Sequence, residues 1–234
     1  MRVAASICGR SEHFNLHPPL NWAQLFKVAS GANRVTTALG TSTITLALVA
    51  GYAGSGKSEA GKLLAAATGW AMLDKDTISR PMTERLLQAL GGDPDDRHSP
   101  TYLEHARPLE YACLMKAVWE NLECGTSVVA VAPFLAEASD AQWTSRVARR
   151  CGRTGSRFET LWVDSDLESM RDRLISRNAS RDTWKLMHWP TYTSGIDVGL
   201  RPVTSHHVID NRIGASRPLA EQVETIAQRL VGDS

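Results

Sequence analysis

The sequence predicts an α/β fold built on a five-stranded parallel sheet with helices on both faces. Five short runs rich in apolar and β-branched residues alternate along the chain with longer segments of helix-forming residues. The runs are apolar at consecutive positions, which is typical of parallel strands buried on both faces of a sheet. The predicted strands are residues 43–50, 70–73, 127–132, 158–163 and 207–210.

A glycine-rich loop follows the first strand directly. Residues 51–58 read GYAGSGKS, which fits the pattern G-x-x-x-x-G-K-[ST], and residues 57–67 favour a helix. A strand before this pattern and a helix after it are the context of a phosphate-binding loop, or P-loop. The residues expected to bind a nucleotide polyphosphate here are Gly51, Ala53, Gly54, Ser55, Gly56, Lys57, Ser58 and Glu59. Within this set, Lys57 should reach the β- and γ-phosphates and Ser58 should ligate Mg²⁺.

Length and composition fit one globular domain preceded by an arm. The chain has 234 residues, of which 43% are hydrophobic and 22% charged, so it is long enough to bury a large core. Residues 1–42 show little periodicity beyond a short helical pattern at 22–28. We expect them to form an N-terminal arm, either helical or partly disordered, and residues 43–234 to form the nucleotide-binding domain.

Charge and cysteine usage narrow the class of partner. The 26 basic and 25 acidic residues give a net charge of +1, which offers no electrostatic reason to expect a nucleic acid or membrane partner. No signal peptide and no apolar run long enough to span a bilayer is evident. Neither the 4 cysteines nor the 7 histidines show metal-site spacing. We expect a cytoplasmic monomer or homodimer with reduced thiols and no zinc site.

The helices are predicted from capping signals. A helical region should follow the second strand, then a loop at 91–96, and then a helix from about 101 to 122 that ends at Gly125. An S-x-x-E capping box at 165–168 should begin another helix, and Pro218 should begin the last one.

Two carboxylates follow the second strand. Asp74 and Asp76 flank Lys75 where the strand should end, and ligand sites of α/β proteins form at the carboxyl ends of strands. A carboxylate there can accept a hydroxyl proton during in-line phosphoryl transfer, or it can cap the next helix. We favour catalysis for Asp76, and both interpretations stay open for Asp74.

Three arginines recur at intervals of four residues. Arg173, Arg177 and Arg181 would share one face wherever the helix persists. A mobile segment can bring such cations over a transferring phosphoryl group, although a solvated charged face is the alternative. We expect a lid at about 173–195, with Arg177 and Arg181 acting in catalysis.

Together these motifs resemble the P-loop small-molecule kinases that include chloramphenicol phosphotransferase, the zeta toxins and gluconate kinase. These proteins have the nucleoside-monophosphate-kinase-like fold of P-loop NTPases. The resemblance covers about residues 43–230. It rests on the P-loop, on the D-K-D element at 74–76, on the arginine-rich stretch 173–182 and on residues 208–211, which read VIDN.

The resemblance implies specific roles and two cofactors. It implies that ATP and Mg²⁺ bind, and that Asp76 is the general base near the acceptor hydroxyl. It also implies that Arg173 stacks on adenine and that Arg177 and Arg181 approach the phosphates. Asn211 lies where relatives place the adenine pocket, although such turns are also ordinary loops.

The acceptor should bind to the helical insertion at about 79–122, because this fold usually places acceptor-binding elements between its second and third strands. The candidate substrate contacts are Asp74, Arg80, Arg107, Glu110 and Tyr111. The alternative for Arg107 and Glu110 is a surface ion pair between helix neighbours. Aromatic residues at 184–192 would close over an acceptor or simply pack.

One departure from the usual pattern concerns the metal. Many P-loop proteins end a strand with an aspartate that holds Mg²⁺ through water, whereas residues 131–134 contain no acid. The candidates for a contact with the metal through water are Asp74 and Asp76, and the sequence leaves the metal shell open.

We therefore predict an ATP- and Mg²⁺-dependent phosphotransferase that moves the γ-phosphate to a hydroxyl of a small molecule, such as an antibiotic, a sugar or a nucleoside-like compound. Two alternatives stay open. One is a zeta toxin-like kinase of a nucleotide sugar, and the other is a regulatory P-loop ATPase without a small-molecule acceptor.

Overall fold

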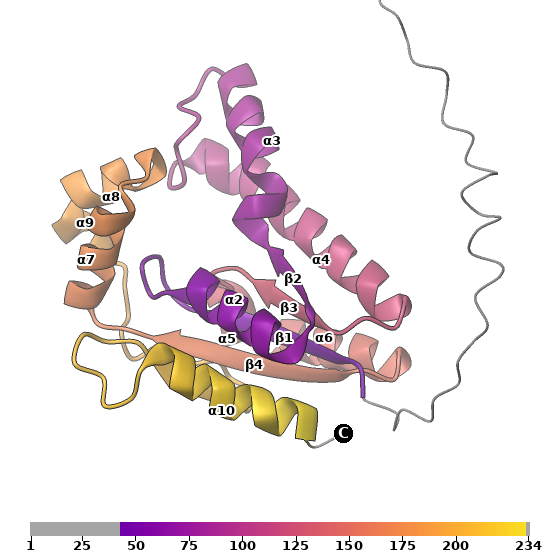
Figure 1. The fold of residues 1–234 in the computed structure, drawn as a ribbon. Helices are drawn as coiled ribbons and strands as arrows, with labels where there is room; N and C mark the ends of the chain where they lie inside the picture. The colour runs from indigo at the N-terminus through magenta and orange to yellow at the C-terminus, as the bar shows by residue number, and fades with distance from the viewer. Residues whose placement is uncertain (1–42, 233–234) are drawn as a thin grey trace, which may run out of the picture. The chain divides into compact units, whose positions relative to one another are not determined.

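A five-stranded, all-parallel sheet forms the centre of the computed structural model, which describes residues 43–232. The strand order is β2-β3-β1-β4-β5 (Figure 1). The strands are β1 (Thr45–Ala50), β2 (Ala71–Asp74), β3 (Val128–Val131), β4 (Arg157–Asp164) and β5 (His207–Asp210). The predicted fold class and all five predicted strands are therefore confirmed. The arm predicted for residues 1–42 lies outside the described residues.

The central strand positions the P-loop. β1 pairs with β3 on one side and with β4 on the other, so that Leu48 lies opposite both Ala130 and Thr160. Parallel strands bring their carboxyl ends to one edge of a sheet, and ligands bind beyond that edge. The P-loop after β1, Asp74 at the end of β2 and Pro133 after β3 consequently meet at this edge.

Helices cover both faces of the sheet (Figure 1). The side chains of Ala47 and Val49 face a core shared with α2 and α10, whereas Leu46 and Leu48 face a core shared with α4 and α6. This alternation buries β1 on both sides, as its consecutive apolar residues predict. The α-helices are α2 (Lys57–Thr68), α3 (Lys75–Ala89), α4 (Arg107–Glu123), α5 (Leu135–Ser139), α6 (Ala141–Arg153), α7 (Leu167–Arg177), α8 (Thr183–Met187), α9 (Trp189–Thr193) and α10 (Leu219–Gly232).

The helix predicted from residue 101 begins differently. Its first turn, Tyr102–Ala106, is π-helical, and α4 follows it. Pro108 lies in the first turn of α4, and in a continuous α-helix its ring would crowd the carbonyl of Glu104 four residues earlier. The wider π turn accommodates the proline, and such turns are frequent at functional sites.

The capping box predicted before α7 is wrong by one residue. Asp166 is the N-cap, and its carboxylate accepts a hydrogen bond of 2.7 Å from the backbone N–H of Ser169. Aspartate and serine cap helices about equally well, so two adjacent candidates compete. The Ser165 hydroxyl instead accepts a hydrogen bond of 3.0 Å from Arg173.

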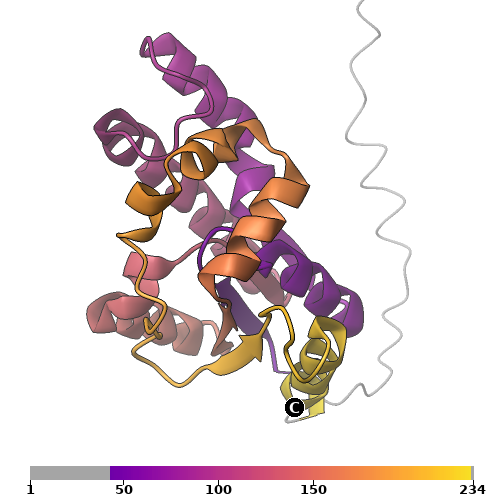
Figure 2. The same ribbon diagram turned by 90° about the vertical axis from the view of Figure 1, so that its left-hand side faces the viewer.

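Arg173, Arg177 and Arg181 do not all lie on one helix. Asn178 adopts a left-handed conformation with φ of 47° and ends α7 at Arg177. Arg181 therefore lies outside this helix, in a 3₁₀ turn at Ser180–Asp182. Figures 1 and 2 show the segment from α7 to α9 beyond the carboxyl ends of the strands, where α3 also begins.

Within residues 43–232, no helix is both long enough and apolar enough to cross a bilayer. In the same range, Cys113, Cys124 and Cys151 form no disulfide. Burial raises the pKa of the Cys151 thiol to about 11, so this residue stays protonated at neutral pH.

Candidate active site

The P-loop has a backbone that only glycine adopts readily. Gly54 and Gly56 have φ of 80° and 96°, in the left-handed region that side chains disfavour. A Cβ at Gly54 would also lie 2.6 Å from the carbonyl oxygen of Met170 on α7. A Cβ at Gly56 would collide with the side-chain amide of Asn211. Two distant segments therefore pack directly against the loop.

Lys57 folds over the loop at the start of α2. Its Nζ donates a hydrogen bond of 2.6 Å to the carbonyl oxygen of Tyr52. Desolvation by burial lowers the pKa of Lys57 to about 8, although the negative charges of Asp76 and Asp74 oppose this shift. The helix N-terminus and this ammonium together form an anion-binding concavity.

Arg173 and Asn211 brace the P-loop from outside. Arg173 donates to the carbonyl oxygen of Gly54 at 3.2 Å and also to the carbonyl oxygen of Asn211. The Asn211 amide donates to the carbonyl oxygen of Ser55 at 2.8 Å. Both residues were expected near adenine, and in the structure both contact backbone carbonyl oxygens of the P-loop.

Ser58 and Asp74 lie in direct contact. The Ser58 hydroxyl donates a hydrogen bond of 2.7 Å to one carboxylate oxygen of Asp74, and the other oxygen accepts the backbone N–H of Asp76 at 2.9 Å. Asp74 therefore caps α3 and also faces the P-loop. Asp74 is the last residue of β2, which pairs with β3. It therefore places a carboxylate beside the end of β3, which has no acidic residue of its own.

Asp76 lies between two cations in the first turn of α3. Lys75 Nζ is 3.0 Å from one carboxylate oxygen and Arg181 is 3.2 Å from the other. Burial by itself would raise the pKa of Asp76, but the charges of Lys75 and Arg181 outweigh it and lower the pKa to about 2. Asp76 is consequently a carboxylate at neutral pH.

Glu110 is the buried partner of Lys75. One of its oxygens lies 2.5 Å from Lys75 Nζ and 2.8 Å from the hydroxyl of Tyr102, and the other accepts the hydroxyl of Thr83 at 2.9 Å. The surface ion pair considered for Glu110 and Arg107 is not what forms. Glu110 faces inward instead, and both of its oxygens are occupied by protein groups.

Arg107 pairs with a different acid. Its guanidinium is 2.7 Å from Glu137 on α5 and lies over the ring of Tyr111, with 4.4 Å between Cζ and the ring centroid. The Tyr111 hydroxyl accepts the backbone N–H of Phe134 at 3.2 Å. Burial raises the pKa of Tyr111, so the phenol stays protonated.

A buried carboxylate organises the segment after α7. Asp182 pairs with Arg177 and lies 3.0 Å from the ammonium of Lys185. Its side chain is almost completely shielded from solvent. Asp182 thereby ties α7 to α8 across the break at Asn178.

The aromatic residues of this segment divide into two groups. Trp184 stacks on His98 with 3.8 Å between ring centroids and also stacks on His188, so these rings pack against one another. Tyr192 instead lines the larger cavity of the site, and burial raises its pKa to about 12.

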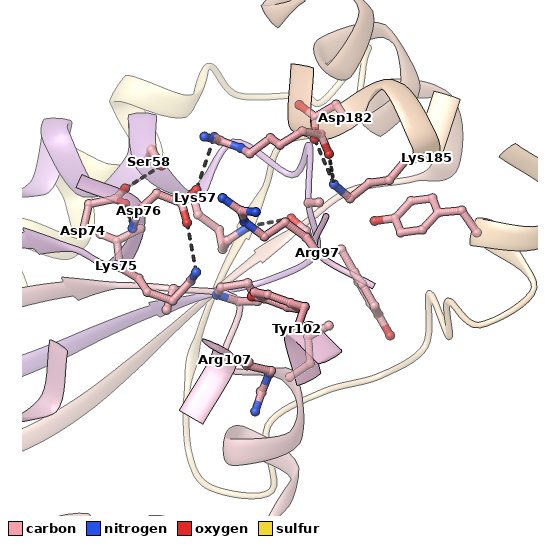
Figure 3. A pocket seen from close by; sticks show the side chains of 18 of the residues that line it. Lys57, Ser58, Asp74, Lys75, Asp76, Arg97, Tyr102, Arg107, Asp182 and Lys185 are labelled. Atoms are coloured by element: carbon pink, nitrogen blue, oxygen red, sulfur yellow. Dashed lines mark hydrogen bonds and ion pairs between the residues drawn. The ribbon is translucent and has the colours of Figure 1, made fainter. Parts of the chain in front are cut away.

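These residues surround a cavity of about 340 Å³, a size suited to a metabolite. Figure 3 shows Ser58, Asp74 and Asp76 grouped together and Tyr102 at a distance from them. The charged residues in its lining are Lys57, Asp74, Lys75, Asp76, Arg97, Arg107, Arg177, Arg181, Asp182 and Lys185. Tyr52, Tyr102, Tyr111 and Tyr192 supply aromatic rings.

The cavity contains some but not all of the predicted substrate residues. Asp74, Arg107 and Tyr111 line it. Arg80 is exposed on α3 and does not line it, although its charge helps to lower the pKa of Asp76. Glu110 supports the cavity from behind through Lys75 and Tyr102.

A second, smaller cavity of about 180 Å³ lies over the P-loop. Its lining consists of Gly54, Gly56, Lys57, Ser58, Glu59, Arg173 and Arg177. Lys57, Ser58 and Arg177 line both cavities, so the two meet at these side chains.

Tyr52, Lys75 and Arg97 are among the lining residues that were not singled out from the sequence. Lys75 was named only as part of the D-K-D element and Tyr52 only as part of the P-loop pattern, and Arg97 lies just after the loop predicted at 91–96. Signals existed for two of them. Lysine inside D-K-D is a cation next to a strand end, and a tyrosine in a P-loop is larger than the turn requires. For Arg97 no local pattern is evident.

The chain is similar to known proteins at the level of family and fold. Residues 46–192 match a protein family described as an AAA domain, AAA_33. A sugar kinase from Janibacter sp. HTCC2649 is 16% identical, with a TM-score of 0.51 over 81% of this chain and 95% of that chain. A gluconokinase from Sinorhizobium meliloti 1021 is 17% identical, with a TM-score of 0.51 over 81% and 94%. At these identities the likeness shows the fold alone. No curated protein matches the chain.

Proposed function

We propose, on the basis that this chain belongs to the AAA domain family AAA_33 and has the fold of P-loop small-molecule kinases, that it transfers the γ-phosphate of ATP to a hydroxyl of a small molecule. The observation that carries this proposal is the meeting of two cavities at Lys57, Ser58 and Arg177. The smaller cavity lies over the P-loop, and the larger one, lined by Asp76, has room for a second molecule. Hydrolysis would not need the larger cavity, because water is its acceptor.

The reaction breaks the bond between Pγ and the oxygen that bridges it to Pβ, and it forms a bond between Pγ and the acceptor oxygen. ADP is the leaving group. Lys57 and Arg177, which line both cavities, are suited to stabilise the charge on the three peripheral oxygens of the transferring group. Arg181, 3.2 Å from Asp76, would add positive charge on the acceptor side.

Asp76 is the proposed general base. The low pKa keeps its carboxylate ionised, so that it can accept the hydrogen bond of the acceptor hydroxyl and take up the proton as the new bond to phosphorus forms. A weak base is sufficient in a loose transition state, because there the acceptor oxygen becomes strongly acidic only late in the transfer.

Ser58 and Asp74 are the residues that would hold Mg²⁺. Their hydroxyl and carboxylate oxygens, already in contact, are of the kind that this cation prefers, and phosphate oxygens and water would complete its shell. Residues 43–232 contain no group of three or more His, Cys, Asp or Glu side chains placed to hold a metal ion. When bound, Mg²⁺ supplies charge neutralisation at the β- and γ-phosphates.

The test is an acceptor screen with γ-labelled ATP and Mg²⁺, in which label is followed into sugars, nucleosides, nucleotide sugars, antibiotics and free phosphate. We expect label in one acceptor class, and a kcat roughly 10²- to 10⁴-fold lower in Asp76→Asn with ATP affinity retained. Asp172→Asn, at an exposed position of α7, is the matched control. Free phosphate alone, released equally by the variant, would instead identify a regulatory ATPase. Label in a nucleotide sugar would select a zeta toxin-like kinase.

A further inference from the structure

Two of the cations that line the larger cavity have no carboxylate partner within residues 43–232, namely Lys57 and Arg97. The other lining cations pair with acids as follows: Lys75 with Glu110, Arg107 with Glu137, Arg177 and Lys185 with Asp182, and Arg181 with Asp76. A nucleotide polyphosphate accounts for Lys57. It does not account for Arg97, which lines the larger cavity but not the smaller one.

The guanidinium of Arg97 is held at one end only. Its Nη1 donates to the carbonyl oxygens of Pro94 and Asp96 at 2.8 and 2.6 Å. Its Cζ lies 5.6 Å from the centroid of the Tyr102 ring, a cation–π contact that further orients the group. The edge formed by Nε and Nη2 has no acceptor among the described residues. That edge is a planar fork of donors, which matches the paired oxygens of a carboxylate or a phosphate.

We propose that the acceptor carries an anionic group, a carboxylate or a phosphate ester, in addition to its reactive hydroxyl, and that Arg97 binds this group. The inference rests on the proposed function, because it names the class of acceptor for the same site. The π-helical turn that begins at Tyr102 brings the supporting ring to the cavity.

The same geometry would disfavour neutral acceptors. The hydroxyl groups of a neutral polyol would accept weaker hydrogen bonds from the free edge of Arg97 than a carboxylate or a phosphate, because they carry no charge. Arg107 cannot take this role as readily, because Glu137 already neutralises it at 2.7 Å. Arg97 is therefore the residue of this cavity that selects for charge.

Matched pairs of ligands test the proposal by titration calorimetry on the protein saturated with Mg²⁺ and a non-hydrolysable ATP analogue. Each pair differs in one anionic group: sugar acids against the corresponding alditols, hydroxy acids against the corresponding polyols, and sugar phosphates against free sugars. We expect an anionic member to bind, and its affinity to fall roughly 10- to 100-fold in Arg97→Gln. Arg97→Lys should lose less, since it keeps the charge without the fork. The acid and phosphate pairs distinguish the two sources of the anion.

Arg85→Gln is the control, because it removes the same charge from an exposed position of α3 outside the cavity. A neutral ligand that binds as tightly as its anionic counterpart, the failure of every anionic probe to bind, or equal affinity in Arg97→Gln would overturn the inference. If Arg97 only supported its loop, Arg97→Gln would lower the affinity for both members of a pair equally. That result would also overturn the inference.

Label transfer from γ-labelled ATP to the same ligands, measured in separate samples without the analogue, separates this inference from the proposed function. An anionic ligand that binds through Arg97 but receives no label would reject the kinase and leave the anion site. Label in a neutral acceptor, unaffected by Arg97→Gln, would reject the anion site and leave the kinase.

Discussion

Lys75 and Glu110 form a buried ion pair, with 2.5 Å between Nζ and Oε2 and only 6% and 2% of the two side chains exposed. The pair joins the first turn of α3 to α4. The same ammonium lies 3.0 Å from Asp76, so the pair also holds a positive charge beside the proposed base. A helical support behind the cavity is thereby coupled to the chemistry at the edge of the sheet.

Glu110→Gln should lower the free energy of unfolding by about 3 kcal/mol, because it leaves the buried ammonium of Lys75 with less negative charge. Urea denaturation followed by circular dichroism measures this change. Glu120→Gln, at an exposed position of the same helix, should change stability by less than about 0.5 kcal/mol. Equal stability of the two variants would show that the buried pair contributes nothing beyond a hydrogen bond.

Nucleotide binding should take up protons at alkaline pH. Lys57 has a pKa of about 8 in the nucleotide-free protein, so at pH 9 it is mostly neutral. A bound polyphosphate favours the ammonium and raises this pKa, and linkage then requires uptake of up to about one proton per nucleotide. Calorimetry of ATP-analogue binding in buffers with different ionisation enthalpies measures the uptake.

The proton uptake should fade as the pH falls from 9 to 7, because Lys57 is already charged below its pKa. In Lys62→Met, a substitution at an exposed position of α2, uptake should persist. Uptake that is independent of pH in this range would contradict the assignment to Lys57.

Asp182→Asn should loosen the segment after α7 without unfolding the domain. The carboxylate of Asp182 joins Arg177 to Lys185, and its removal leaves two like charges close together. We expect faster amide hydrogen exchange in α8 and a lower kcat, with exchange in β1 unchanged. The exposed Asp172→Asn variant should match the native protein in all three measurements. Unchanged exchange in α8 would mean that packing alone orders this segment.

Asp74→Asn should raise the Mg²⁺ concentration needed for half-maximal activity by roughly tenfold or more, as loss of a supporting metal contact does in other sites. Asparagine retains the hydrogen bond that caps α3, so the effect should fall on the metal and not on the fold. Thermal denaturation of the variant checks that the stability of the fold is unchanged. A normal Mg²⁺ requirement would remove Asp74 from the metal site.

The strands were predictable because each depends on neighbours in the chain. Runs of consecutive apolar residues mark strands that are buried on both faces, and β1 has no exposed residue. Helix ends were less predictable, since Ser165 and Asp166 are both good caps and only the packing decides between them. The break after Arg177 also had a local signal in Asn178, because asparagine often ends a helix by adopting the left-handed conformation. The prediction did not use this signal.

The roles assigned to site residues from the sequence stay predictions. The contacts of these residues could be found only from the three-dimensional structure. Arg107 and Glu110 are neighbours on a helix, and a local rule pairs them. In the structure each finds a partner much farther along the chain, Glu137 in one case and Lys75 in the other. No spacing rule reaches across 30 or 35 residues.

The fold class and the P-loop were thus contained in local sequence patterns, because burial periodicity, turn glycines and helix formers act over a few neighbouring residues. The partners of charged side chains were decided by the tertiary structure. The order β2-β3-β1 brings Asp74 to Ser58, and the approach of α3 to α4 brings Lys75 to Glu110. Among residues 43–232 Arg97 has no carboxylate partner for the same reason, since Coulomb attraction depends on distance in space and not on separation along the chain.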